Sequence, residues 1–234
     1  MPPHVSHAIT RLLLVSVIAA AAWGDHGAAV CEWAHLSWSP VCDGTKDKDW
    51  FSLATATATA FSTLLLLFQS YIWRTWIGRK VFGWPIPNLN GTWRGAVIPD
   101  SAGTGVAPIV LIPVYLVVHQ TAFGIQVTQY TRESHSRTIT AEFTQTGHDI
   151  ELTYSYWNTP RQNIQHRSPV HYGTTILRMA PENPECLSGF YFTQRLTRGE
   201  LSFDGKTTKK AHDFAEAEAL TYVARPSPCA AIES

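Results

Sequence analysis

Two segments of the sequence combine glycines, aromatic rings and hydrogen-bonding side chains at a spacing of two residues. The first is PNLNGTWRG, from Pro87 to Gly95, and the second is LSGFYFTQRLTRG, from Leu187 to Gly199. Alternate side chains of a β-strand share one face of the sheet. One face of the first segment would therefore carry Gly91, Trp93 and Gly95, and one face of the second would carry Gly189, Tyr191, Thr193, Arg195, Thr197 and Gly199.

These two faces support a structural and a functional interpretation. Glycines on an inward face let a strand bend and leave room for a large ring. Gly91, Trp93 and Gly189 are therefore predicted as structural barrel positions, with Trp93 as the floor and a guanidinium that could stack on it. For Thr193 and Arg195 a binding role has comparable weight, because a buried arginine among tyrosines and threonines needs an anionic partner.

The sequence contains none of the familiar catalytic or metal-binding motifs. There is no GxSxG, HExxH, P-loop or GxGxxG pattern, and the ten histidines are scattered. Carboxylates within the predicted strands are sparse and unpaired, which argues against a glycosidase pair. The sequence therefore predicts a binding module rather than an enzyme, with no catalytic residues, no cofactor and no metal.

Short alternating segments that could form strands fill the chain after residue 85. The predicted strands are Asn90–Ile98, Val110–His119, Gly124–Thr131, Thr138–Thr144, Ile150–Trp157, Val170–Arg178, Leu187–Leu196, Glu200–Phe203 and Leu220–Ala224. One helix is expected, at Asp213–Ala219. Strands without intervening helices are typical of a sandwich or barrel. We expect an all-β domain over residues 85–225, a compact antiparallel, lipocalin-like barrel of about eight strands, followed by a tail over 226–234.

The first 84 residues are predicted to form a membrane region. Phe51 to Ile72 is a run without Asp, Glu, Lys, Arg or His, and about 20 helical residues span a hydrocarbon core. Arg74, Arg79 and Lys80 follow it, which predicts a cytoplasmic end. We expect a helix at about 8–24, a periplasmic loop at 25–49, a second helix at 50–73 and a linker at 74–84. The shorter first run could instead be a signal peptide.

Cysteines and overall charge set two further expectations. Cys31 and Cys42 lie in the predicted periplasmic loop and are a disulfide candidate, whereas Cys186 and Cys229 are expected as free thiols. Lys plus Arg equals Asp plus Glu, at 18 each, so no overall basic field exists for gripping a DNA or RNA duplex.

The arrangement of these segments resembles one bacterial family. Two N-terminal hydrophobic helices, a Trp-Pro linker, the GTWRG strand and the GFYFTQRLTRGEL strand are similar to the SMODS-associating two-transmembrane β-strand-rich effectors of CBASS anti-phage defence, also called CD-NTase-associated protein 15. The resemblance implies a multi-pass protein of the bacterial inner membrane with its barrel in the cytoplasm. It also implies that the barrel binds a cyclic di- or trinucleotide from a cognate nucleotidyltransferase. Binding would trigger homo-oligomerisation and disruption of the lipid bilayer, leading to abortive infection.

A cyclic dinucleotide makes two chemical demands on such a barrel. Its phosphates favour guanidinium and hydroxyl partners, and its bases favour aromatic platforms. The residue types that meet these demands predict a ligand set of Arg94, Tyr115, Thr128, Tyr130, Tyr154, Tyr191, Thr193 and Arg195. Which of them point inward depends on the register, because a shift of one residue exchanges the two faces of a strand.

Two other functions fit parts of the same sequence. A membrane-tethered, lipocalin-like carrier of an apolar ligand would have an apolar pocket without an inward arginine. A membrane-bound hydrolase would require an active site that carries no familiar motif. The receptor hypothesis instead predicts arginine and threonine between aromatic rings.

Overall fold

A computed structural model of the chain describes residues 5–19, 50–100, 111–146, 149–180 and 183–224. The chain divides into two compact units, Met1–Pro85 and Ile86–Ser234. The first is helical and the second is built almost entirely of β-strands.

The first unit contains a helix over residues 5–19, α3 (Trp50–Ser70), the 3₁₀ turn η1 (Ile72–Arg74) and α4 (Trp76–Lys80). The ring of Phe68 packs edge-on against Phe82 and Trp84, with centroids 5.1 and 5.5 Å away. Arg11 donates a hydrogen bond of 2.9 Å to the carbonyl of Val81. The helical unit is therefore held together by aromatic contacts and by a link between its first helix and the end of α4.

The two predicted transmembrane helices are not supported by this part of the structure. None of the helices in the described residues combines the length and the apolar character needed to cross a membrane. In α3, threonines alternate with alanines, and their hydroxyls lower its hydropathy. The loop at 25–49, with the disulfide candidate Cys31 and Cys42, lies outside the described residues.

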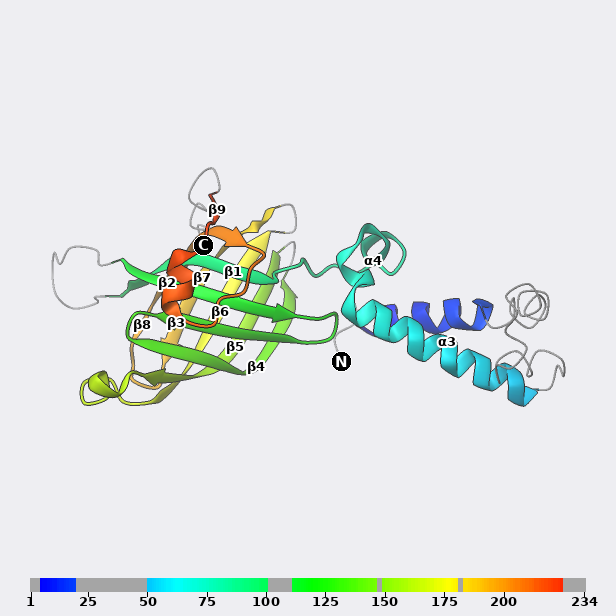
Figure 1. Cartoon of the computed structure of the whole chain (residues 1–234), viewed down its shortest axis with the longest axis horizontal. Helices are drawn as coiled ribbons and strands as arrows, with labels where there is room; N and C mark the ends of the chain where they lie inside the picture. Colours follow the sequence, from blue (N-terminus) through cyan, green and yellow to red (C-terminus); the bar gives the residue numbers. More distant parts are fainter. Residues whose placement is uncertain (1–4, 20–49, 101–110, 147–148, 181–182, 225–234) are drawn as a thin grey trace. The chain divides into compact units, whose positions relative to one another are not determined.

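The second unit is a closed antiparallel β-barrel, which confirms the predicted barrel of about eight strands (Figure 1). Strands follow each other around the sheet in chain order, and β1 pairs with β8 to close it. The strands are β1 (Gly91–Pro99), β2 (Ile112–Gln120), β3 (Ile125–Thr131), β4 (Ser134–Thr146), β5 (Asp149–Pro160), β6 (His171–Ala180), β7 (Asn183–Thr193) and β8 (Arg198–Thr207). A short β9 (Val223–Ala224) pairs with β8, and the turn η2 (Gln162–Ile164) lies between β5 and β6.

The late strand predicted at Leu187–Leu196 ends earlier than expected. β7 stops at Thr193, and a turn through Leu196, whose φ is +60°, leads into β8 at Arg198. The turn is closed by hydrogen bonds from Leu196 N to the Thr193 carbonyl and from Thr193 N to the Thr197 carbonyl. The second segment is thus a hairpin, and Arg195 and Thr197 do not continue the strand face of Thr193.

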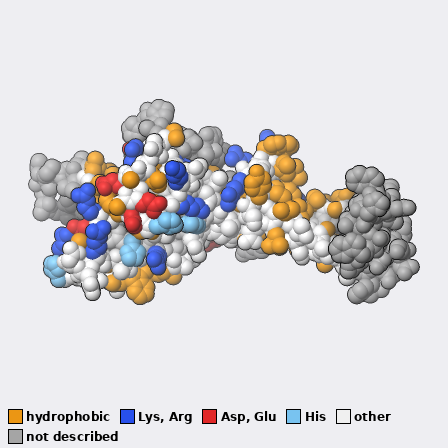
Figure 2. Space-filling model, viewed as in Figure 1, with side chains coloured by type: hydrophobic (Ala, Val, Ile, Leu, Met, Phe, Trp, Pro, Cys, Tyr) orange, Lys and Arg blue, Asp and Glu red, His pale blue; other side chains and the backbone are white. Residues whose placement is uncertain are grey.

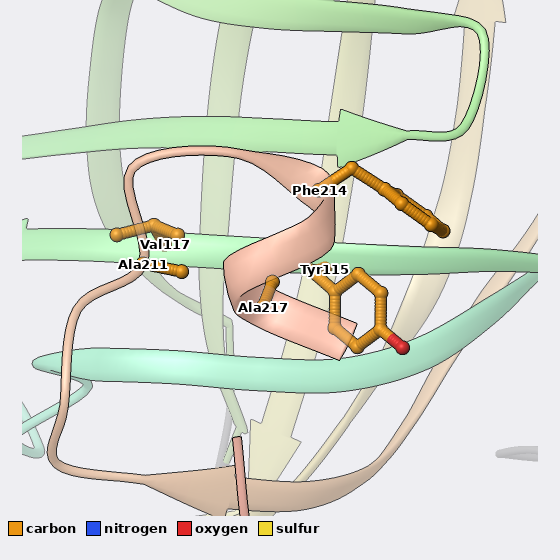
Figure 3. Close-up of a cluster of buried hydrophobic side chains, with 5 residues drawn as sticks. All are labelled: Tyr115, Val117, Ala211, Phe214 and Ala217. Atoms are coloured by element: carbon orange, nitrogen blue, oxygen red, sulfur yellow. The ribbon is translucent and has the colours of Figure 1, made fainter. Parts of the chain in front are cut away.

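The short helix α5 (Phe214–Ala219) marks the outer face of the barrel, because it packs against β2 from outside (Figures 1 and 3). Asp213 caps it by accepting a hydrogen bond from Glu216 N, as expected for a helix at Asp213–Ala219. The buried cluster under α5 consists of Tyr115, Val117, Ala211, Phe214 and Ala217. Tyr115 and Val117 therefore point outward, and the alternate residues of β2, among them Leu116, point into the barrel.

One end of the barrel interior is filled by apolar side chains. Trp93, Leu116, Leu152, Leu177 and Phe203 are each exposed by no more than 1%. The indole of Trp93 donates to the carbonyl of Leu89 at 2.9 Å, which fixes it near the start of β1. The cation over the Trp93 ring is Lys206, whose Nζ lies 4.7 Å from the ring centroid, rather than the guanidinium anticipated from the sequence.

The outer surface carries charges of both signs. On the face shown in Figure 2, Lys and Arg side chains alternate with Asp and Glu. Ion pairs such as Arg94–Asp204, with 3.0 Å between Nε and Oδ1, and Arg178–Glu151, at 2.8 Å, lie on the outward face of the strands. This mixture agrees with the balanced composition of the chain.

Candidate ligand-binding site

The opposite end of the barrel interior is lined by hydrogen-bonding residues of β3 to β7. The strand register places these residues on the same face as the buried apolar side chains of the other end. We call this set the polar wall: Gln129, Ser134, Ser136, Tyr154, Tyr156, Asn158, His171, Thr175, Tyr191 and Thr193. Several of its members are buried, including Ser136, Tyr154, Tyr156, His171, Thr175 and Thr193.

Hydrogen bonds hold several side chains of the polar wall in place. The amide nitrogen of Asn158 donates to the hydroxyl oxygens of Ser134 and Ser136, at 3.2 and 3.1 Å. The phenol of Tyr154 donates to the Gln129 side-chain oxygen at 3.1 Å. These bonds cross from β5 to β3 and β4, so the orientation of both side chains is set before any ligand arrives.

Two buried polar atoms of the polar wall have no hydrogen-bond partner within the described residues. They are the Asn158 carbonyl oxygen Oδ1 and the Thr175 hydroxyl oxygen. The Thr175 hydroxyl lies close enough to the phenols of Tyr154 and Tyr156 to act on the pKa values of both tyrosines. It forms no hydrogen bond of normal geometry with either phenol. Buried polar groups are nearly always paired with protein, water or ligand, so an unpaired cluster in a barrel interior indicates a binding site.

Two tyrosines of the polar wall lie against glycines of the neighbouring strand. Tyr156 is directly opposite Gly173, and Tyr191 is directly opposite Gly199. A Cβ at Gly173 would overlap the Tyr156 phenol, and a Cβ at Gly199 would clash first with the Ile98 carbonyl oxygen and would also lie 2.9 Å from Cε1 of Tyr191. The missing side chains therefore make room for the rings along the barrel wall, where aromatic faces can serve as platforms for flat ligands.

The phenols in this region are neutral at physiological pH. Burial raises the pKa of Tyr156 to about 12. Burial likewise raises the pKa of Tyr154 and of Tyr191 above the ordinary tyrosine value. A neutral phenol can still donate and accept hydrogen bonds, and it does not repel an anionic ligand.

Arginines gather on the connections at the same end of the barrel. In an antiparallel meander the β3–β4, β5–β6 and β7–β8 connections lie at one end, and they carry Arg132, Arg161, Arg167 and Arg195. Arg167 pairs with Glu133. Arg195 donates to the Ser168 hydroxyl at 2.7 Å and to the Arg167 carbonyl at 3.4 Å, which are neutral acceptors. Arg132 is paired with Glu218 at 3.6 Å, so the positive charge that the rim offers an anion comes mainly from Arg161 and Arg195.

Half of the ligand residues predicted from the sequence lie on the outer face. Arg94 pairs with Asp204 and lies 5.4 Å above the Tyr222 ring. Tyr115 packs edge-on against Phe214, with centroids 5.3 Å apart, and Tyr130 donates to the His212 carbonyl at 2.7 Å. Thr128 is opposite Val117, which also faces outward. The structure therefore separates Arg94, Tyr115, Thr128 and Tyr130 from the barrel interior.

The other predicted residues lie at the polar end. Tyr154, Tyr191 and Thr193 belong to the polar wall, and the Thr193 hydroxyl is bonded to that of Thr197 at 2.7 Å. Arg195 lies on the β7–β8 turn and is exposed, so the expectation of a buried arginine was wrong. The turn explains this position, because it carries Arg195 out of the strand and over the rim.

Sequence reasoning missed Tyr156, Asn158, His171 and Thr175. A signal for two of them was present, because Ile150, Leu152, Tyr154, Tyr156 and Asn158 follow a period of two along β5. Extending this face beyond Tyr154 would have found Tyr156 and Asn158. His171 and Thr175 become visible only through the pairing of β6 with β5.

Comparison with known proteins identifies the barrel. A search among curated proteins gives no match. A family model described as the Cap15 cyclic dinucleotide receptor domain matches residues 84–204, just over half of the 234-residue chain. The match runs from the start of the barrel into β8, and it confirms the resemblance seen in the sequence. A closed barrel with a polar, tyrosine-lined interior suits a receptor for such a ligand, and the chain belongs to the Cap15 cyclic dinucleotide receptor family.

Proposed function

We propose that the barrel binds a cyclic dinucleotide at the polar wall, with the bases inside and the phosphates towards the arginine rim. The observation that carries this proposal is the placement of two glycine-backed tyrosines, Tyr156 and Tyr191, at the end of the barrel where the arginines gather. A cyclic dinucleotide has two bases and two phosphates, so it needs both kinds of partner together.

The expected energetics favour this arrangement. Stacking of a base on an aromatic side chain contributes roughly 1–3 kcal/mol. The phosphates gain charge-assisted hydrogen bonds from guanidinium groups such as that of Arg195, at the cost of its weaker bonds to Ser168 and Arg167. The ligand would also supply partners to the unpaired oxygens of Asn158 and Thr175.

The polar wall argues against a carrier of apolar ligands. The apolar end of the interior is packed with side chains such as Trp93 and Phe203, each exposed by only 1%. At the other end a lipid tail would leave the hydroxyls and amides of the polar wall without partners, which is unfavourable.

Calorimetry of the purified full-length chain with a panel of cyclic di- and trinucleotides tests the binding proposal. At least one cyclic dinucleotide should bind, and Tyr191→Ala should weaken its affinity by about tenfold or more. The matched control is Tyr172→Ala, because Tyr172 is a half-exposed tyrosine on the outward face of β6. Equal losses in both variants, or no binding to the wild-type chain, would contradict the proposal.

We further propose that binding activates an antiviral CBASS effector. In this proposal a cognate nucleotidyltransferase makes the ligand, the bound chain forms homo-oligomers, and the inner membrane is disrupted so that infection is abortive. The run from Phe51 to Ile72 is uncharged, but α3 lacks the apolar character of a membrane span, so the membrane step of this proposal rests on the family resemblance. A ligand can drive such a change only through different affinities for the free and associated states.

Expression of the full-length chain with and without a nucleotide-producing enzyme tests the effector step. Dye entry into cells and sedimentation of the chain should both increase only when the nucleotide is made. Dye entry at the same level without the nucleotide would contradict ligand gating.

A further inference from the structure

The unpaired carbonyl oxygen of Asn158 gives the polar wall a chemical preference. Both hydrogens of the Asn158 amide nitrogen are directed at serine hydroxyls, Ser134 and Ser136. The Thr131 hydroxyl donates to the Ser134 carbonyl at 3.2 Å, so the Ser134 hydroxyl, 3.0 Å away, can donate to Thr131 Oγ1 and accept from Asn158. In this arrangement Asn158 Oδ1 is buried without a partner among the described residues. A ligand that reaches Asn158 meets an acceptor and no donor.

The other unpaired group of the polar wall, which the register places opposite Tyr154, does not select in the same way. The Thr175 hydroxyl can donate or accept, so it can adapt to either kind of ligand atom. The neighbouring phenols of Tyr156 and Tyr191 have the same freedom. In the hydrogen-bond arrangement of the structure, Asn158 therefore offers a ligand an acceptor only.

The position of Asn158 is suited to the edge of a stacked base. Asn158 is two residues after Tyr156 on β5, so both side chains lie on the inward face. A base stacked on the Tyr156 ring would have its edge directed along the wall, where Asn158 projects. Polar contacts to a base edge provide specificity, whereas stacking is tolerant of sequence.

We infer that Asn158 is a specificity-determining residue that accepts a hydrogen bond from the exocyclic amine of a nucleobase. This inference rests on the proposed binding of a cyclic dinucleotide at the polar wall. The ligand then carries at least one amine-bearing base, namely adenine, guanine or cytosine. A base with a keto oxygen in place of the amine would bring two acceptors together and leave Oδ1 unpaired.

Pairs of ligands that carry or lack an exocyclic amine test this inference, and the guanine–hypoxanthine pair is the cleanest because it only replaces the amine by hydrogen. The full-length chain is titrated with cyclic di-AMP and cyclic di-GMP against cyclic di-IMP, and with cyclic di-CMP against cyclic di-UMP. For the ligand that binds best, the amine-bearing member should bind about 10- to 100-fold more tightly than its deaminated partner. Asn158→Ala should reduce this ratio to about one, whatever it does to the absolute affinity.

Two further variants separate recognition from folding. In the Ser134→Ala/Ser136→Ala double variant, Asn158 remains but its amide can rotate. The ratio of affinities for the amine-bearing and the amine-free ligand should therefore be smaller than in the wild type. Ser155→Ala is the matched control, because Ser155 is on β5 but faces outward, bonded to Thr174 at 3.2 Å, and its ratio should equal that of the wild type.

Three results would overturn the inference. The first is a wild-type chain that binds the deaminated ligand as tightly as the amine-bearing one. The second is a folded Asn158→Ala variant that keeps the full preference. The third, no binding of any of these ligands to the wild-type chain, would refute the proposed function itself and the inference with it.

Discussion

The two ends of the barrel interior are built by the same strands from opposite kinds of side chain. Along β5, Ile150 and Leu152 point into the apolar end, and Tyr154, Tyr156 and Asn158 point into the polar end. The apolar end is close-packed, whereas the polar end contains two buried oxygens without partners.

Within this one small domain, the apolar end of the barrel contributes to folding stability and the polar end is suited to binding a ligand. Close-packed apolar side chains contribute free energy of folding, and unpaired buried polar atoms reduce it. A ligand that supplies the missing hydrogen-bond partners of the polar wall offsets this cost, because it binds only the folded chain and stabilises it. Truncations at the two ends should therefore have opposite profiles, one affecting folding and the other affecting binding.

The largest expected effect is on stability, at the apolar end. Leu152 is fully buried, so Leu152→Ala should lower the free energy of unfolding by about 2–5 kcal/mol. Asn158→Ala should lower it by less, because Asn158 already has an unpaired oxygen. Urea denaturation of both variants checks this, and a greater loss for Asn158→Ala would remove the distinction between the two ends.

The next effect is alkaline destabilisation through Tyr156. The pKa of Tyr156 is raised from 10.0 to about 12 in the folded chain. Between these pH values the unfolded chain releases the proton and the folded chain keeps it, so stability falls as pH rises from about 10 to about 12. The loss is on the order of 3 kcal/mol.

Comparison with Tyr156→Phe isolates this contribution from other groups that titrate at high pH. Unfolding free energies of both proteins should be measured from pH 9 to pH 12. The wild-type curve should fall more steeply than that of the variant, and parallel curves would show that the Tyr156 phenol is not protected by burial.

A smaller effect is expected for the wall glycine beneath Tyr156. Gly173→Ala places a methyl group where the Tyr156 phenol lies, so the ring must move into the space proposed for the ligand. Binding of the best cyclic dinucleotide should weaken by about tenfold, or about 1.4 kcal/mol. Gly124→Ala is the control, because its methyl group would meet Thr121 Oγ1 at an ordinary 3.5 Å. Similar calorimetric affinities for the two variants would contradict the platform role.

The smallest effect is expected at the rim. Arg195 is exposed, so Arg195→Ala should weaken binding by about 1 kcal/mol or less, and the difference should shrink at high salt. Arg178→Ala, at the other end of the barrel and paired with Glu151, is the control. A large, salt-independent loss would mean that Arg195 enters the interior when ligand binds.

The strand pattern was predictable from the sequence because it depends on local alternation and turns. Nine strands and α5 were expected within about four residues of their observed bounds, and the error that matters most for the site was the end of β7. At that point Leu196 adopts a left-handed conformation that makes a turn, and a leucine does not predict such a conformation.

The candidate site was only partly predictable because inward and outward faces depend on pairing. Tyr154, Tyr191 and Thr193, chosen by residue type alone with their orientation left open, face the interior in the structure. Tyr115 and Tyr130 have the same chemistry but lie on the outer face. Tyr115, on β2, packs against α5, and Tyr130, on β3, donates to the His212 carbonyl in the loop before α5. No local pattern reveals such a contact, and the same holds for the pairing that brings Gly173 beneath Tyr156.

A structure of the full-length chain bound to its best cyclic dinucleotide tests the central claim most directly. We expect a base stacked on Tyr156, its amine within hydrogen-bond distance of Asn158 Oδ1, and a phosphate near the Arg195 guanidinium. A ligand bound instead on the outer face, between Arg94, Tyr115 and Tyr222, would contradict it.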